Sequence, residues 1–326
     1  MTKPPDRIAL VMGLGRSGTT FLAKLIDTAP QVLYRHEPDA LLPTDLPSFC
    51  ASDQIGTHLT EARDYVRAMA DCRLCKSNGT RPLFAKSYRS RLDNLAYRTM
   101  IMSSKIGRRF RLPIGDSIPD LVRTKHQDML YLIKSVSALG RAQLLSRAVP
   151  QLACIHIVRH PCAVYASLQS GRKRGLMQTK IRLEPLFEQP ESAQYPFTRE
   201  EMANATFEEQ IAYRWMLTND KAAIDMAESS RYLRVGYEDL CTDIDRVSRQ
   251  VFDHLNLPLC TQTKRFINEI SSTSVEGANR VGYFDVKRSI GSAINKWKTQ
   301  LGQETIERIR AVVSHSPLGR MYFDET

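Results

Sequence analysis

A glycine-rich segment near the amino terminus has the residue types of a phosphate cradle. The sequence Gly13-Leu-Gly-Arg-Ser-Gly-Thr-Thr20 directly follows the apolar run Ile8–Met12. A buried strand that ends in a glycine turn delivers the chain to a helix start, where backbone N–H groups lack intrahelical partners and can bind an anion. Four residues of the segment are therefore expected to contact phosphate: Ser17, Gly18, Thr19 and Thr20.

The same segment allows two other interpretations. Hydroxyl side chains often cap helices without binding a ligand, so Ser17 and Thr19 could serve only that purpose. The spacing from Gly13 to Gly18 also matches the loop of ATP- and GTP-splitting proteins, but those carry lysine where this chain has Thr19. A P-loop kinase-like phosphotransferase is therefore one alternative. Arg16 is the only cation of the loop, and we expect it to stabilise negative charge because arginine keeps its proton.

A second anion-binding pattern follows the apolar run Ala153–Val158. Arg159 stands where this strand is expected to end, and the helix predicted over Cys162–Gln169 carries Ser167. A guanidinium binds an anion through parallel N–H groups, and a hydroxyl adds one more donor. A salt-bridging arginine beside an ordinary surface serine is the simpler alternative. We expect Arg159 and Ser167 to bind one anion together.

Apolar runs alternate with helical patterns along the chain, which is typical of a mostly parallel sheet covered by helices on both faces. Five strands are predicted: Ile8–Met12, Gln31–Tyr34, Tyr131–Ile133, Ala153–Val158 and Arg231–Val235. Ligands of open parallel sheets bind beyond the carboxyl ends of the strands. Five polar residues should therefore meet at one edge: Arg16, Glu37, Lys134, Arg159 and Tyr237. Among them Glu37 is the candidate general base, and Lys134 would supply a further positive charge.

These motifs, in this order, resemble those of the sulfotransferases that use 3′-phosphoadenosine-5′-phosphosulfate (PAPS). In that family a loop like the one around Arg16 binds the 5′-phosphosulfate, and a segment like Val158–Ser167 binds the 3′-phosphate. The resemblance covers most of the chain. It implies an α/β fold of the P-loop nucleotide-binding type, with PAPS as co-substrate, in-line transfer to an acceptor hydroxyl, and no metal ion.

The resemblance also implies roles for single residues. In the carbohydrate and tyrosyl-protein branches a glutamate follows the loop arginine at the spacing from Arg16 to Glu37, which implies Glu37 as the base. Lys134 matches a lysine near the transferred group. Tyr237 matches a tyrosine that approaches the adenine, and Phe21 stands in the place of an aromatic residue beside the cofactor.

Two departures separate this chain from the small-molecule branch of the family. Val136 stands where that branch has its histidine base, and Arg16 stands where it has lysine. Both departures argue against a phenol or steroid acceptor. The setting Tyr34-Arg-His-Glu-Pro38 resembles carbohydrate sulfotransferases, which implies a carbohydrate or glycolipid acceptor, with a hydroxyl outside carbohydrates as the alternative.

The 326 residues are expected to form a single domain, 1–326, because 42% apolar residues can bury one large core. Acceptor-side insertions are expected over 39–125 and 183–205, the latter as a mobile excursion with three prolines. Helical patterns occupy seven further segments: Gly18–Thr28, Thr60–Ala70, Arg89–Ser103, Leu139–Ala148, Phe207–Glu228, Asp243–Leu255 and Gln303–Val313.

The net charge of +11 is concentrated in one segment, since eleven Lys and Arg against three Asp lie between Arg81 and Lys125. These residues could form solvated helix faces that attract a polyanionic cofactor. They could instead bind an anionic acceptor, such as an acidic glycan or a lipid headgroup, with peripheral membrane contact, or belong to a binding protein without catalysis. Nucleic acid is not expected as a partner, because aromatic residues do not alternate with the basic ones.

Cysteine usage and hydropathy bear on the compartment. The seven cysteines are an odd number, and several lie in apolar stretches, which favours reduced thiols and a cytoplasmic protein. We expect Cys72 and Cys75 to be surface or loop cysteines, because a metal or redox site would need a second pair or a thioredoxin-like context. No apolar run approaches the ~18–20 residues that span a bilayer, and no signal peptide or transmembrane segment is expected.

Overall fold

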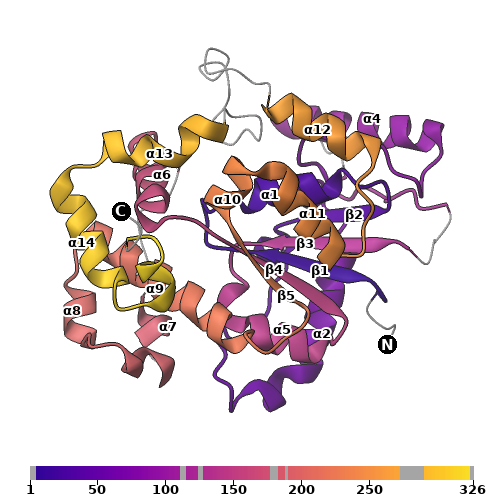
Figure 1. The fold of residues 1–326 in the computed structure, drawn as a ribbon. Coiled ribbons are helices and arrows are strands. Elements are labelled where there is room, and N and C mark those ends of the chain that lie inside the picture. The colour runs from indigo at the N-terminus through magenta and orange to yellow at the C-terminus, as the bar shows by residue number, and fades with distance from the viewer. Residues whose placement is uncertain are drawn as a thin grey trace.

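The computed structural model describes residues 5–110, 115–123, 128–176, 183–187, 190–271 and 290–323. At its centre lies a five-stranded sheet with the strand order β2-β3-β1-β4-β5, and every pair of neighbours is parallel (Figure 1). The strands are β1 (Ile8–Met12), β2 (Val32–His36), β3 (Leu130–Ser135), β4 (Leu152–Val158) and β5 (Tyr232–Gly236). All five carboxyl ends therefore meet at one edge, as predicted.

Helices cover both faces of the sheet, which confirms the predicted α/β architecture (Figure 1). Ile8, Leu10 and Met12 of β1 belong to one apolar cluster, whereas Ala9 and Val11 belong to another, because successive side chains of a strand point to opposite faces. The first cluster includes residues of α2 (Ile55–Asp71), α5 (Ala142–Ala148), α6 (Pro161–Lys173), α9 (Phe207–Asp225) and α14 (Gln303–Val313). The second includes residues of α1 (Thr19–Asp27), α10 (Tyr237–Thr242), α11 (Ile244–His254) and α12 (Thr261–Ser271).

The remaining helices lie at the periphery of these two layers. They are η1 (Pro38–Ala40), α3 (Cys75–Asn78), α4 (Arg91–Arg109), η2 (Leu139–Arg141), α7 (Glu184–Phe187), η3 (Pro190–Gln194), α8 (Arg199–Ala203), α13 (Ile290–Gln300) and α15 (Pro317–Arg320). No helix of the described residues is long and apolar enough to cross a membrane.

The segment 183–205 differs from the mobile excursion that we predicted. Its described residues include three short helices, α7, η3 and α8. Thr198 begins α8 with a capping box, in which its hydroxyl accepts from the Glu201 N–H and the Glu201 carboxylate accepts from the Thr198 N–H. The Thr-x-x-Glu pattern was visible in the sequence, but the prolines and polar residues around it outweighed it.

Cys72 and Cys75 are also placed differently from our expectation. Both side chains are buried, between the end of α2 and the start of α3, and both are free thiols. The apolar residues Tyr97, Ile101 and Ile118 surround Cys75 in one cluster. These cysteines therefore pack as small apolar residues and are not surface positions.

A buried arginine explains why β2 extends beyond its prediction. Arg35 lies inside the strand with 1% of its surface exposed. Its guanidinium donates to Asp120 Oδ1 at 2.9 Å and Oδ2 at 2.7 Å, to Asn78 Oδ1 at 2.8 Å and to the Ala70 carbonyl at 2.8 Å. A buried charge is tolerated when it is paired and hydrogen-bonded. The partners of Arg35 come from the insertion 39–125, which thereby covers the edge strand of the sheet.

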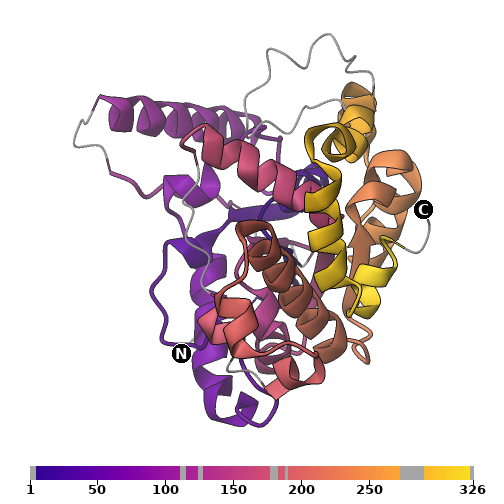
Figure 2. The same ribbon diagram turned by 90° about the vertical axis from the view of Figure 1, so that its left-hand side faces the viewer.

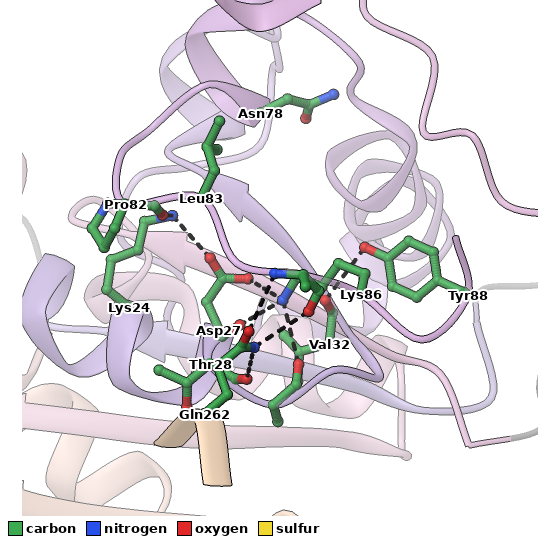
Figure 3. A network of polar contacts seen from close by, with 12 residues as sticks. Lys24, Asp27, Thr28, Val32, Asn78, Pro82, Leu83, Lys86, Tyr88 and Gln262 are labelled. Carbon is green, nitrogen blue, oxygen red and sulfur yellow. Dashed lines mark hydrogen bonds and ion pairs between the residues drawn. The ribbon is translucent and has the colours of Figure 1, made fainter. Parts of the chain in front are cut away.

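A second buried ion cluster fixes the same insertion to α1 (Figure 3). Lys24 Nζ lies 2.9 Å from Asp27 Oδ2, and Lys86 Nζ lies 2.7 Å from Asp27 Oδ1. Burial lowers the pKa of both lysines, and the Asp27 carboxylate opposes that shift. One carboxylate therefore keeps two buried ammonium groups charged.

Replacing this carboxylate should be costly. Asp27→Asn leaves two buried cations without their counter-ion, and removing one partner of a buried ion pair lowers the free energy of unfolding by about 3–5 kcal/mol. The matched control is Glu304→Gln, since the Glu304–Arg308 pair is exposed and such pairs contribute about 0–1 kcal/mol. Urea denaturation of both variants measures the difference. Equal losses would show that the Asp27 cluster is not a buried ion network.

Candidate active site

The turn between β1 and α1 forms a cradle of backbone N–H groups. Gly18 is the N-cap of α1, with φ 90°, and no side chain caps the helix. A Cβ at Gly18 would overlap the Tyr237 ring, so only glycine fits this turn. The helix-capping interpretation of the hydroxyls is therefore not what the structure shows. The N–H groups of the first turn of α1 are oriented as an anion site requires.

Ser17 is a buried hydroxyl at this cradle. Its exposed fraction is 0%, and its Oγ has no hydrogen-bond partner among the described residues. Buried polar atoms are nearly always hydrogen-bonded, so an orphaned hydroxyl next to an uncapped helix start fits an absent anionic ligand. Thr19 is buried and Thr20 is half-buried beside it.

Arg16 joins the two sequence motifs. Its Nε donates to Ser167 Oγ at 3.0 Å, and Arg159 Nη1 donates to the Arg16 carbonyl at 3.0 Å. Arg16 itself has φ 77°, a left-handed conformation that non-glycine residues adopt rarely and mostly at functional sites. The structure thus brings the glycine loop, Arg159 and Ser167 into one cluster.

Tyr237 and Trp215 position Arg159. The register pairs Val158 with Gly236, which places Arg159 and Tyr237 side by side after β4 and β5. The Tyr237 ring centroid lies 4.4 Å from the Arg159 Cζ, and the Trp215 indole N–H donates to the Arg159 carbonyl at 2.8 Å. The sequence does not reveal this role of Trp215, because a buried tryptophan in an amphipathic helix has the pattern of a packing residue.

Glu37 and Lys134 form a second polar group at the same edge. Lys134 lies opposite His36 in the register of β2 and β3, and the Glu37 N–H donates to the Lys134 carbonyl at 2.8 Å. The Lys134 Nζ makes a short hydrogen-bonded ion pair with Glu37 Oε1. Glu37 has φ 44°, so it too adopts a left-handed conformation.

The charges of this pair support each other. Burial alone would raise the pKa of Glu37, but the Lys134 ammonium holds it below the ordinary value of 4.5. Burial lowers the pKa of Lys134, which is 2% exposed, and Glu37 opposes that shift. The Arg16 guanidinium also lowers the pKa of Lys134, so the positive charges of the two groups act on each other.

Asp39 was not identified from the sequence. Its Oδ2 accepts from Ser135 Oγ at 2.5 Å and from Ser137 Oγ, so it ties the turn after Glu37 to the end of β3. A carboxylate two residues after the candidate base was visible in the sequence, but its partners are nearly a hundred positions away. Asp39 therefore acts as a positioning residue for the Glu37 turn.

The histidines near the site are neutral at physiological pH. Burial and the charge of Lys134 lower the pKa of His36 to about 4, and its Nδ1 shares a hydrogen bond with the Tyr34 hydroxyl at 2.8 Å. Burial lowers the pKa of His160 to about 3, and its Nδ1 accepts from the Cys162 N–H at 3.1 Å, which caps α6. Both have local structural partners.

Phe21 and the metal question complete the placement of the predicted residues. Phe21 is 9% exposed and packs in the apolar cluster of α1, and its contact with a cofactor stays a prediction. Within the described parts of the chain, no group of three or more His, Cys, Asp or Glu residues could hold a metal ion.

Comparison with known proteins gives one family. Residues 9–261 match the family model described as "Sulfotransferase family". Carbohydrate sulfotransferase 2 of mouse is 24% identical and that of human 23% identical, each over 346 residues. The alignments cover 93% of this chain and 62% of each relative, so the chain spans less than two thirds of the length of these curated relatives.

A sulfotransferase domain from the curacin biosynthetic pathway is 16% identical, with a TM-score of 0.46, over 96% of this chain and 99% of that one. The family match is the decisive comparison, because it runs from β1 to the start of α12 and so includes every candidate site residue. The chain therefore belongs to the sulfotransferase family.

Proposed function

We propose that this protein transfers the sulfuryl group of PAPS to the hydroxyl of an acceptor, with a carbohydrate or glycolipid as that acceptor. The observation that carries the proposal is the direct contact between the two anion motifs, through the Arg16–Ser167 and Arg159–Arg16 hydrogen bonds. A donor with phosphate groups at both ends of one ribose needs two such groups of donors close together. The alternative, a P-loop kinase-like phosphotransferase, is disfavoured because Thr19 replaces its lysine.

The residues fit PAPS in type and arrangement. The uncapped start of α1, with the orphaned Ser17 hydroxyl, would hold the 5′-phosphosulfate. Arg159 and Ser167 would hold the 3′-phosphate. The resemblance to the family places the adenine near Tyr237 and Phe21. When bound, PAPS supplies an activated sulfuryl group whose leaving group is adenosine 3′,5′-bisphosphate.

The chain's own residues then divide the chemistry. Glu37 accepts the proton that the acceptor hydroxyl loses as its oxygen bonds to sulfur. A carboxylate has two oxygens, so Glu37 can keep Lys134 on Oε1 and receive the proton on Oε2. Lys134 and Arg16 stabilise the negative charge that the breaking sulfur–oxygen bond leaves on the 5′-phosphate. Transfer is in line, because attack and departure occur on opposite sides of sulfur.

The acceptor class rests on two observations. The curated relatives of this chain are carbohydrate sulfotransferases, and the turn after β2 that carries Glu37 resembles theirs. The insertion 39–125, which lies beside this turn, is rich in Lys and Arg and would favour an acidic glycan or an anionic headgroup. A hydroxyl outside carbohydrates is the second candidate acceptor.

Ligand binding separates the proposal from its alternative. Adenosine 3′,5′-bisphosphate at about 100 times its Kd should stabilise the fold by about 2.7 kcal/mol and raise the Tm. ATP with Mg²⁺ should raise the Tm less at the same concentration, because it carries no 3′-phosphate. A rise with ATP and Mg²⁺ but none with the bisphosphate would favour the kinase. Radiolabelled PAPS offered to a panel of glycans then identifies the acceptor.

Glu37→Gln tests the base. The amide keeps the shape of the side chain but cannot take a proton, so kcat should fall at least about 100-fold. The affinity for adenosine 3′,5′-bisphosphate should stay within about twofold, because Glu37 is not expected to touch the nucleotide. The exposed Glu304→Gln variant serves as the matched control. Unchanged turnover in Glu37→Gln would exclude Glu37 as the base.

The pH profile of kcat/KM tests the same group independently. Because Lys134 holds the pKa of Glu37 below 4.5, the base stays ionised, and kcat/KM should be constant from neutral pH down to about pH 5. On the alkaline side, loss of the Lys134 proton should lower kcat/KM below pH 10.5, since burial depresses that pKa. A decline centred near pH 6.5 would indicate a histidine base and contradict the assignment.

A further inference from the structure

The helix α4 has two apolar sides, and only one of them packs on the protein. Tyr97 and Ile101 are buried on the inner side, in a cluster with Cys75 and Ile118. The outer side carries five exposed large apolar residues: Leu92 (77%), Leu95 (64%), Met102 (40%), Ile106 (52%) and Phe110 (67%). We call these five residues the outer stripe. They are five of the eight exposed large apolar residues in the described parts of the chain.

The outer stripe is continuous along the helix. Its members are separated by three, seven, four and four positions, which places them on one side of an α-helix. The helix lies at the edge of the molecule, labelled in Figure 1 and visible as the purple helix at the upper left of Figure 2. With 19 residues it is about 28 Å long. An exposed apolar row of this length marks an interaction surface.

A basic row runs beside the outer stripe. Arg91, Arg98, Lys105 and Arg109 repeat at helical spacing along one flank, and the three arginines are exposed. Asp93 is the only acidic residue of α4, and Arg123 pairs with it. Arg81 from the preceding loop contacts the Met102 sulfur at the margin of the stripe. The surface therefore combines an apolar row with a strongly positive border.

This combination favours one kind of partner. A helix with an apolar face and Lys and Arg along its border is typical of helices that lie in the surface of a bilayer. Anionic headgroups complement the charge, and acyl chains accept a stripe of Leu, Ile, Met and Phe without needing a matching shape. A protein interface, by contrast, usually has few charged residues at its core and a shaped apolar counterpart.

We propose that α4 is a membrane-contact helix that binds anionic lipid surfaces. The outer stripe enters the boundary between headgroups and acyl chains, and the basic row binds the headgroup phosphates. This proposal does not rest on the proposed sulfuryl transfer, and its test measures binding alone. If the acceptor is a glycolipid, the same contact would bring the enzyme to its substrate.

Co-sedimentation with vesicles tests the proposal. The full-length protein should bind phosphatidylcholine vesicles that contain about 30% phosphatidylserine, and bind vesicles of phosphatidylcholine alone at least about tenfold more weakly. The double variant Leu95→Gln/Ile106→Gln should lower the partition coefficient on anionic vesicles at least about tenfold. Ile224→Gln is the matched control, because Ile224 is a 53% exposed apolar residue of α9 outside the stripe.

The charged border has its own variants. Arg91→Gln/Arg109→Gln should weaken binding to anionic vesicles by about 25-fold, since each basic residue near such a surface contributes a factor of about five. Arg249→Gln, an exposed arginine of α11, should have no such effect. Thermal melts of all variants should match the parent, because the replaced side chains are exposed.

Three outcomes would overturn the proposal. The first is no binding to anionic vesicles, and the second is equal binding to neutral ones. The third is a dimer in sedimentation velocity that dissociates in Leu95→Gln/Ile106→Gln, because the stripe would then be covered by a second copy of the chain. Each outcome leaves the transferase proposal intact, since none of the substituted residues lies in the candidate active site.

Discussion

The contact between the glycine loop and the β4 turn is the constraint on which the site depends. Arg16 reaches Ser167 with its side chain, and its carbonyl accepts from Arg159. These segments meet because β1 and β4 are neighbours in a parallel sheet, so α1 and α6 begin at the same edge. Parallel strands thus bring two groups of anion donors, distant in the sequence, to one place. A sheet with another strand order would separate them.

The same edge carries backbone conformations that cost free energy. Arg16 and Glu37 both have positive φ values, which for residues with a Cβ typically cost about 1–3 kcal/mol each. Their surroundings hold them in place: Arg159 binds the Arg16 carbonyl, and the Lys134 carbonyl accepts from the Glu37 N–H. Asp39 adds a second tie between the Glu37 turn and β3. The two strained residues are those assigned to charge stabilisation and proton transfer, which is where such strain is usually found.

Local patterns sufficed for the sheet and for most of the site. Apolar runs and strand ends led to all five strands and to Arg16, Glu37, Lys134, Arg159 and Tyr237. What the sequence missed depends on partners far along the chain. A buried arginine such as Arg35 makes sense inside a strand only once Asp120 is known to face it, and the role of Asp39 depends on Ser135. The exposed stripe of α4 was missed for a related reason, since an apolar periodicity does not tell which of two sides faces the core.

The central claim is that both anion groups hold one nucleotide, and a crystal structure with adenosine 3′,5′-bisphosphate tests it most directly. The account predicts the 5′-phosphate at the N–H groups of Gly18 and Thr19 and the 3′-phosphate at Arg159 and Ser167. A bisphosphate bound at only one of these groups, or away from the carboxyl edge of the sheet, would contradict it.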